Sequence, residues 1–170
     1  MRNFLKATGL ASVLLLTACG NNASQNQYTT SGQVKTVQLG PVNVSGPLGQ
    51  EPTVTVTTSM EPIGNLMVAD SAVGSGPAVT SASTVTAHYV GYGVQSGAMF
   101  DGSWSRGEPA TFPLNGVIQG WQVGLVGMQA GGRRVLVIPG DMAYGDAPPG
   151  GSGIAPNEPL IFVVDLVSIQ

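Results

Sequence analysis

Hydrophobic and β-branched residues are concentrated in three short runs in the second half of the chain. Each run is bounded by glycine or proline, and the segments that connect the runs have no long helical pattern. Short β-branched runs with such boundaries are typical of β-strands. We therefore predict three strands, at Thr84 to Tyr92 (TVTAHYVGY), Arg133 to Ile138 (RRVLVI) and Leu160 to Ile169 (LIFVVDLVSI).

The segment from Ile118 to Met128 is the one candidate helix. Its apolar side chains, including Trp121 and Leu125, could form one face of a short helix. Glycines at positions 120, 124 and 127 lower its helix propensity. The pattern alone therefore leaves this helix undecided.

Residues 21–62 are rich in Asn, Gln, Ser, Thr, Gly and Pro and have few charges, as linkers do. Two stretches inside this segment, Gln33 to Leu39 (QVKTVQL) and Thr53 to Thr58 (TVTVTT), alternate apolar and polar residues like half-buried strands. The composition predicts a flexible linker, in which each stretch could instead form an added edge strand. If residues 20–62 were all coil, their root-mean-square reach would be roughly 35 Å.

At the start of the chain, basic Arg2 and Lys6 precede a short apolar run that ends in LTAC. A bilayer-spanning helix needs about 20 apolar residues, whereas a charged start, a short apolar core and a small-residue cleavage point are typical of an export signal. LTAC followed by Gly20 resembles a bacterial lipobox, which implies cleavage before Cys19 and a lipid on that cysteine. An ordinary cleaved signal is the alternative. Cys19 is the only cysteine of the chain, which favours lipidation and excludes an internal disulfide.

These patterns divide the chain into a signal peptide at 1–18, a lipidated cysteine with its linker at 19–62, and a folded domain at 63–170. The last part is long enough for one compact core, and we expect a monomer. A domain anchored in this way would lie in the cell envelope, on the periplasmic side of a membrane. Gly20 is not the aspartate that commonly marks inner-membrane retention, so the outer membrane is a plausible location in a two-membrane cell.

The charge balance limits the partners of the chain. Without Arg2 and Lys6, four basic residues face nine acidic ones. Nucleic-acid binding needs a basic stripe, but the only basic cluster is the pair Arg133 and Arg134, which we interpret as a solvated strand start. The same balance disfavours an anionic membrane surface, so membrane attachment would depend on the lipid.

Several kinds of catalytic site are excluded by residue type. His88 is the only histidine and there is one cysteine, so the usual zinc shells cannot be assembled within the chain, and His88 is interpreted as a structural strand residue. A serine hydrolase would need His88 and a G-x-S-x-G elbow, and Ser152 within GGSG lacks that spacing. The glycine-rich loop Gly145 to Gly153 lacks the Lys-Ser/Thr ending of a phosphate cradle. We interpret it as a mobile flap.

Four motifs follow one another in the domain: FDGSWSRGEP from Phe100, GVIQGW from Gly116, MAYGD from Met142 and PNEPLIF from Pro156. In this order and spacing they resemble the FKBP-type peptidyl-prolyl cis-trans isomerases, and the resemblance covers roughly Leu66 to Gln170. It implies an α+β fold in which a curved antiparallel β-sheet is wrapped around one short α-helix, with a ligand pocket between helix and sheet. The helix at 118–128 is predicted on this ground.

The resemblance also implies roles for individual residues. The hydroxyl of Tyr144 and the backbone N–H of Ile154 would donate hydrogen bonds to substrate carbonyls. Asp101 would face the twisting carbonyl in a dry pocket, with Arg106 as its ion-pair partner. Trp121 would form the pocket floor. The apolar walls would be Tyr89, Phe100, Val117, Ile118 and Phe162.

Three positions depart from the family pattern. Ala110 stands where many relatives have an aromatic wall residue, Ala155 replaces one of two consecutive prolines, and Gly102 replaces a common serine. None of the three removes a catalytic group. The change at Ala110 is expected to widen the pocket and to alter substrate preference and macrolide affinity.

The resemblance implies a peptidyl-prolyl cis-trans isomerase that assists the folding of exported proteins. Rotation about an X-Pro bond crosses a barrier of about 18 to 20 kcal/mol but breaks no bond, so no cofactor is expected. A dry pocket lowers that barrier because it removes the water that stabilises the planar amide. The expected partners are proline-containing segments of exported proteins and macrolide inhibitors. The alternative is a membrane-tethered binding module or chaperone that has kept the pocket without turnover.

Overall fold

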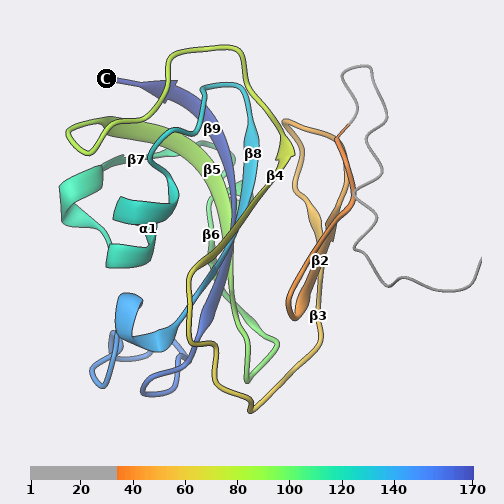
Figure 1. Cartoon of the computed structure of the whole chain (residues 1–170), viewed down its shortest axis with the longest axis vertical. Helices are drawn as coiled ribbons and strands as arrows, with labels where there is room; N and C mark the ends of the chain where they lie inside the picture. The colour runs from red at the N-terminus through yellow and green to blue at the C-terminus, as the bar shows by residue number, and fades with distance from the viewer. Residues whose placement is uncertain (1–33) are drawn as a thin grey trace, which may run out of the picture.

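The computed structural model describes residues 34–170, and its centre is a six-stranded antiparallel sheet (Figure 1). Five strands follow the order β4-β8-β9-β5-β6, and β7 pairs with the first part of β5. All three strands predicted from the sequence are present, with bounds that differ by at most one residue. The strands are β4 (Met67–Ala72), β5 (Thr84–Gly93), β6 (Met99–Gly102), β7 (Ala110–Pro113), β8 (Arg133–Ile138) and β9 (Leu160–Ile169).

The part of the chain that the structure describes has a single α-helix, α1 (Gln119–Gly124), which packs on one face of this sheet (Figure 1). Its glycines allow a close approach: a Cβ atom at Gly120 would lie 2.3 Å from Cγ2 of Ile138, and one at Gly124 would lie 2.8 Å from Cδ2 of Leu136. The helix is shorter than the predicted 118–128, because the chain turns at Gly127 with a left-handed φ of 79°. The expected antiparallel sheet with one short helix is thus confirmed.

The opposite face of the main sheet is covered by a second, three-stranded sheet (Figure 1). Val42 and Val44 are fully buried in the cluster between the two sheets, whereas Gln38 and Thr55 are exposed. The alternating stretches at 33–39 and 53–58 therefore do contain strands, but these strands pair through the VNV stretch between them instead of extending the main sheet. The predicted linker thus includes a folded unit, with strands β1 (Val37–Leu39), β2 (Val42–Ser45) and β3 (Thr53–Val56).

A buried ion pair fastens the small sheet to the main sheet. The guanidinium group of Arg133 donates to both carboxylate oxygens of Asp165, with Nη2 at 2.7 Å from Oδ2. It also donates to the carbonyl oxygens of Gly46 and Gln50, at 3.1 and 2.6 Å, and the N–H of Gly49 donates to Asp165. Arg133 is fully buried, so its interpretation as a solvated residue was wrong: the turn between β2 and β3 covers it.

The neighbouring Arg134 lies on the other face of β8. It pairs with Asp70 of β4, with Nη2 at 2.9 Å from Oδ2, and its Nη1 donates to the carbonyl oxygens of Gly124 and Val126 at the end of α1. Consecutive residues of a strand point to opposite faces, so two adjacent arginines fasten different elements to the main sheet.

No helix within residues 34–170 is long and apolar enough to cross a membrane. The predictions for the signal peptide and for Cys19 concern positions outside the described residues.

Candidate active site

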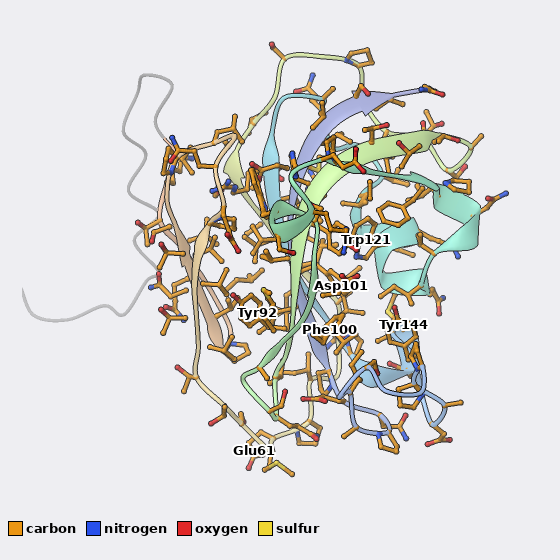
Figure 2. All side chains as sticks on the ribbon, turned by 180° about the vertical axis from the view of Figure 1, so that it is seen from behind. Glu61, Tyr92, Phe100, Asp101, Trp121 and Tyr144 are labelled. Carbon is orange, nitrogen blue, oxygen red and sulfur yellow. The ribbon has the colours of Figure 1, made fainter. Side chains whose placement is uncertain are left out.

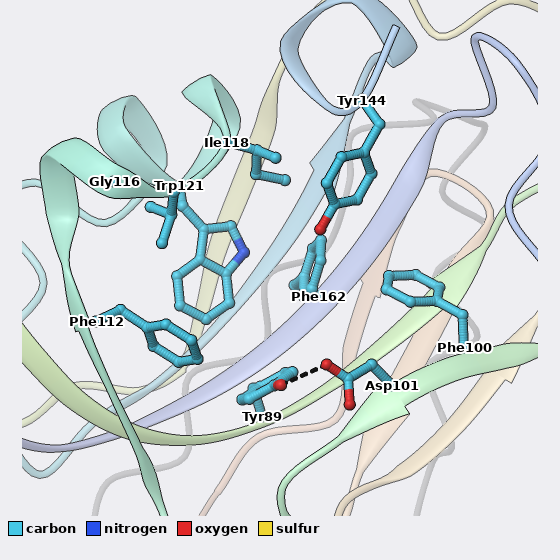
Figure 3. A pocket seen from close by; sticks show the side chains of 10 residues that line it. Tyr89, Phe100, Asp101, Phe112, Gly116, Ile118, Trp121, Tyr144 and Phe162 are labelled. Carbon is cyan, nitrogen blue, oxygen red and sulfur yellow. Dashed lines mark hydrogen bonds between the residues drawn. The ribbon is translucent and has the colours of Figure 1, made fainter. Parts of the chain in front are cut away.

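A pocket of about 280 Å³ opens between α1 and the main sheet (Figure 3). Most of its wall is aromatic, and its side chains come from β5, β6, β7, β9, the α1 region and the segment after β8. Figure 2 shows that Phe100, Asp101, Trp121 and Tyr144 project into the same region, whereas Tyr92 points toward the small sheet. The lining residues are Tyr89, Phe100, Asp101, Phe112, Gly116, Val117, Ile118, Trp121, Tyr144 and Phe162.

Trp121 is the most enclosed aromatic side chain of the pocket, with 3 % of its surface exposed. Three rings meet it edge to face: Tyr89, Phe112 and Phe162, at centroid distances of 5.8, 5.5 and 5.3 Å. Such perpendicular contacts are the favourable arrangement for aromatic pairs and fix the orientation of the indole. Its Nε1 has no hydrogen-bond partner among the described residues. This position agrees with the predicted pocket floor.

Glycine at position 91 makes room for two of the walls. A Cβ atom there would lie 2.6 Å from the Phe100 ring and 3.0 Å from the Phe162 ring. The two rings cover the backbone of Gly91 and meet each other edge to face at 5.6 Å. Any side chain at position 91 would therefore displace the rings of Phe100 and Phe162 toward the pocket.

One carboxylate, that of Asp101, lines the pocket, and two neighbours orient it (Figure 3). The Tyr89 hydroxyl donates to its Oδ2 at 2.5 Å, and Nη1 of Arg106 donates to its Oδ1 at 2.9 Å. Nη2 of Arg106 also donates to the Tyr89 hydroxyl at 3.0 Å. The predicted ion pair is present, but the two side chains are 45 % and 48 % exposed. The expectation of a dry environment for this pair was wrong, because the pair lies at the pocket mouth.

The hydrogen bonds decide the ionisation state of Asp101. Burial by itself would raise the pKa of this carboxyl, but the donors from Tyr89, Arg106 and the N–H of Gly102 outweigh burial and hold the pKa below its usual value. Burial raises the pKa of Tyr89, and the hydrogen bond to Asp101 raises it further. At neutral pH the site therefore contains a carboxylate and a protonated tyrosine.

Tyr144 follows the 3-10 helix Gly140–Met142, and its hydroxyl points into the pocket (Figure 3). Burial, and to a smaller extent the charge of Asp101, raise the pKa of Tyr144, so its O–H stays protonated near neutrality. The hydroxyl makes no hydrogen bond to another side chain or backbone group within residues 34–170. It is therefore free to donate to a bound molecule.

Ile154 is the one predicted site residue of the domain that is neither in the pocket lining nor bonded to a lining residue. Its side chain packs against the edge of the core cluster, and its backbone N–H donates to Oγ of Ser152 at 3.3 Å. The adjacent Gly153 has a left-handed φ of 75°, which turns the chain here. In this structure the predicted donor of Ile154 is thus engaged within its own loop.

The sequence analysis missed two lining residues, Phe112 and Gly116. Phe112 lies two positions after Ala110 on the same face of β7, because side chains of a strand alternate with a period of two. Ala110 packs against the core but does not line the pocket. The alternation Ala-Thr-Phe was a usable signal for an aromatic wall at position 112.

His88 lies on the other face of β5, away from the pocket. It stacks on Trp104 with ring centroids 4.0 Å apart, and its Nδ1 is 3.0 Å from Oγ of Ser103. Among the described residues, no group of three or more His, Cys, Asp or Glu side chains could hold a metal ion.

The fold and the pocket together define a class of domain. An antiparallel sheet and a short helix form a pocket that can bind a compact apolar group, and one oriented carboxylate lies at the mouth of this pocket. A family model described as FKBP-type peptidyl-prolyl cis-trans isomerase matches residues 76–167, which is more than half of the chain. The chain belongs to this family, and it is a peptidyl-prolyl cis-trans isomerase, as its motifs predict. The small sheet lies outside the matched residues.

Known proteins agree with this assignment. The chain is 49 % identical over 111 residues to an FK506-binding protein of Streptomyces anulatus, covering 64 % of this chain and 90 % of that protein. It is 44 % identical over 104 residues to a probable FK506-binding protein of Corynebacterium glutamicum, covering 61 % and 86 %. The crystal structure of FkpA from Escherichia coli superposes with a TM-score of 0.56 at 40 % identity, covering 62 % of this chain and 48 % of FkpA.

Proposed function

We propose that the aromatic pocket is the isomerase site and that Asp101 is the group that acts on the reacting amide. The observation that carries this proposal is the arrangement at the pocket mouth, where Tyr89 and Arg106 orient an ionised carboxylate above an apolar floor. A proline ring would rest on Trp121 between Phe100 and Phe162. The amide next to it would then lie beside Asp101.

Isomerisation needs an environment that favours the twisted amide over the planar one. Resonance in the planar amide produces a barrier of about 18 to 20 kcal/mol, and water stabilises the polar planar form. The aromatic walls remove that water, and each 1.36 kcal/mol taken from the barrier raises the rate about tenfold. Asp101 faces the carbonyl as it leaves conjugation, and the free hydroxyl of Tyr144 donates to a substrate carbonyl and fixes the bound segment.

We further propose that the domain works on exported proteins while a lipid on Cys19 anchors it. Uncatalysed prolyl isomerisation takes tens to hundreds of seconds, so a catalyst near the site of export would shorten folding. The folded small sheet shortens the tether: fourteen residues, 20–33, separate Cys19 from the described part of the chain. As coil, they would reach about 20 Å, instead of the roughly 35 Å expected for a linker that ended at residue 62.

The two tryptophans of the chain provide a matched test of the site. Trp121→Ala removes the pocket floor, whereas Trp104→Ala removes a ring on the opposite face of the sheet. We expect kcat/KM for an X-Pro tetrapeptide to fall at least tenfold in the first variant and to stay within twofold of wild type in the second. Both should be assayed without a coupling protease, at a temperature where circular dichroism shows each to be folded.

A second variant keeps the test valid if Trp121→Ala does not fold, since such truncations cost about 3 to 5 kcal/mol of stability. Tyr144→Phe deletes one hydroxyl at nearly constant volume, so it should leave the melting temperature unchanged and lower kcat/KM about fivefold. Full activity in both variants would place the reaction elsewhere.

A further inference from the structure

Glu158 is a buried carboxylate that the pocket does not use. It lies two residues before β9, and 2 % of its surface is exposed. Its Oε1 accepts hydrogen bonds from the backbone N–H groups of Gln95 and Ser96, at 3.1 and 2.9 Å. Its Oε2 accepts one from the N–H of Ala155 at 2.9 Å. Three backbone donors thus surround one charge.

These donors belong to two separate segments that both lead into the pocket. Gln95 and Ser96 form the turn between β5 and β6, and β6 contains the lining residues Phe100 and Asp101. Ala155 lies in the loop that joins Tyr144 to β9. The carboxylate of Glu158 therefore links the turn that leads into β6, the strand of Asp101, to the loop that begins at Tyr144.

The surroundings of the carboxylate are shaped to hold it. A Cβ atom at Gly93 would lie 2.3 Å from Oε1 of Glu158, so the glycine leaves the space that the carboxylate fills. The base of the loop closes next to it, where the N–H of Asn157 donates to the carbonyl of Gly145 at 2.7 Å. The side chain of Asn157 also donates to Asp146. Movement of Glu158 would therefore shift both ends of this loop.

The charge state of Glu158 agrees with this role. Burial would raise the pKa of the carboxyl, but the N–H groups of Ala155, Ser96 and Gln95, together with the side chain of Ser96, outweigh burial and lower the pKa below its usual value. The group is ionised at neutral pH, and each N–H group faces an oxygen that only accepts.

We propose that Glu158 is a positioning residue for the isomerase reaction: its carboxylate holds the β5–β6 turn and the loop before β9 at the spacing that sets Phe100 and Asp101 relative to Tyr144. This inference rests on the proposed assignment of the aromatic pocket as the isomerase site. Tyr89 and Arg106 orient Asp101 independently of Glu158, whereas Phe100 and Tyr144 are set by the two segments that the carboxylate joins. The loss of the carboxylate therefore acts on substrate binding more than on the rate of the bound substrate.

Glu158→Gln tests this role, because one acceptor oxygen becomes an NH₂ group that faces a backbone donor. Glu61→Gln is the matched control: Glu61 is exposed and lies far from the pocket (Figure 2). We expect Glu158→Gln to raise KM for an X-Pro peptide about tenfold and to keep kcat within twofold of wild type. Glu158→Asp, which keeps the charge on a shorter side chain, should give an intermediate KM. The control should match wild type.

A purely structural role would give a different pattern. If folded Glu158→Gln has a lower melting temperature but an unchanged KM, the carboxylate stabilises the fold without positioning the site, and the proposal is overturned. If Glu158→Gln fails to fold, Glu158→Asp decides, and an unchanged KM in Glu158→Asp also overturns the proposal. Trp121→Ala is measured in parallel: full activity in that variant rejects the pocket itself, whereas an inactive Trp121→Ala with normal KM in Glu158→Gln rejects only the role of Glu158.

Discussion

Replacing Arg133 with methionine removes the cation from a fully buried ion pair and should detach the small sheet. Asp165 is only 6 % exposed, and without Arg133 its charge would keep a single hydrogen-bond donor within residues 34–170, the N–H of Gly49. The carbonyl oxygens of Gly46 and Gln50 would lose their partners as well. Breaking a buried pair from one side costs about 3 to 5 kcal/mol. That is a large part of the roughly 5 to 15 kcal/mol by which domains are stable.

The loss should appear in thermal unfolding as a fall in melting temperature of about 10 °C or more. Arg134→Met is the control, because the partner of Arg134, Asp70, is 29 % exposed and can be solvated by water; that variant should lose on the order of 1 kcal/mol.

Limited proteolysis should cut Arg133→Met between β2 and β3, at residues 46–52. Isomerase activity at a temperature where the variant is folded should persist, because the pocket lies on the other face of the main sheet.

A double variant separates lost charge pairing from lost packing. Arg133→Met with Asp165→Leu leaves no uncompensated charge, and it should regain most of the stability lost in the single variant. A melting temperature of Arg133→Met within 2 °C of wild type, or an equal destabilisation of Arg134→Met, would refute the stabilising role of the buried ion pair.

Two further predictions concern the anchor and the pH dependence. Cys19→Ser should release the protein from membranes with kcat/KM unchanged, as measured by fractionation and assay of one preparation; a variant that still sediments with membranes in high salt would contradict lipid anchoring. With a substrate that lacks titratable groups, kcat/KM should be nearly flat between about pH 5.5 and 8, because the lowered pKa of Asp101 and the raised pKa of Tyr144 keep both groups in one state. In acid, activity and the stability contributed by the Asp101 hydrogen bonds should decline together, since a carboxyl with a lowered folded-state pKa loses its contribution as the pH falls through that pKa. A tenfold change within this pH range that His88→Gln abolishes would refute a mechanism without proton transfer.

The sequence alone determined the features that depend on local composition. Runs of β-branched residues between glycine and proline located β5, β8 and β9, because such runs fit a pleated, half-buried surface in any fold that buries them. The ordered motifs placed Asp101, Trp121 and Tyr144 in one site before any contact between them was known. Eight of the nine residues predicted as catalytic or substrate-binding line the pocket.

Only the tertiary structure decided the features that depend on distant partners. Nothing local distinguishes Arg133 from Arg134, yet one is fully buried because Asp165 and the β2–β3 turn meet it from other parts of the chain. The polar segment around β1 to β3 resembled a linker, since its few valines find enough apolar surface only on the back of the main sheet. The burial of Glu158 could not be predicted from the sequence either. A carboxylate can be buried where folding brings three backbone donors to it, and sequence spacing does not reveal that convergence.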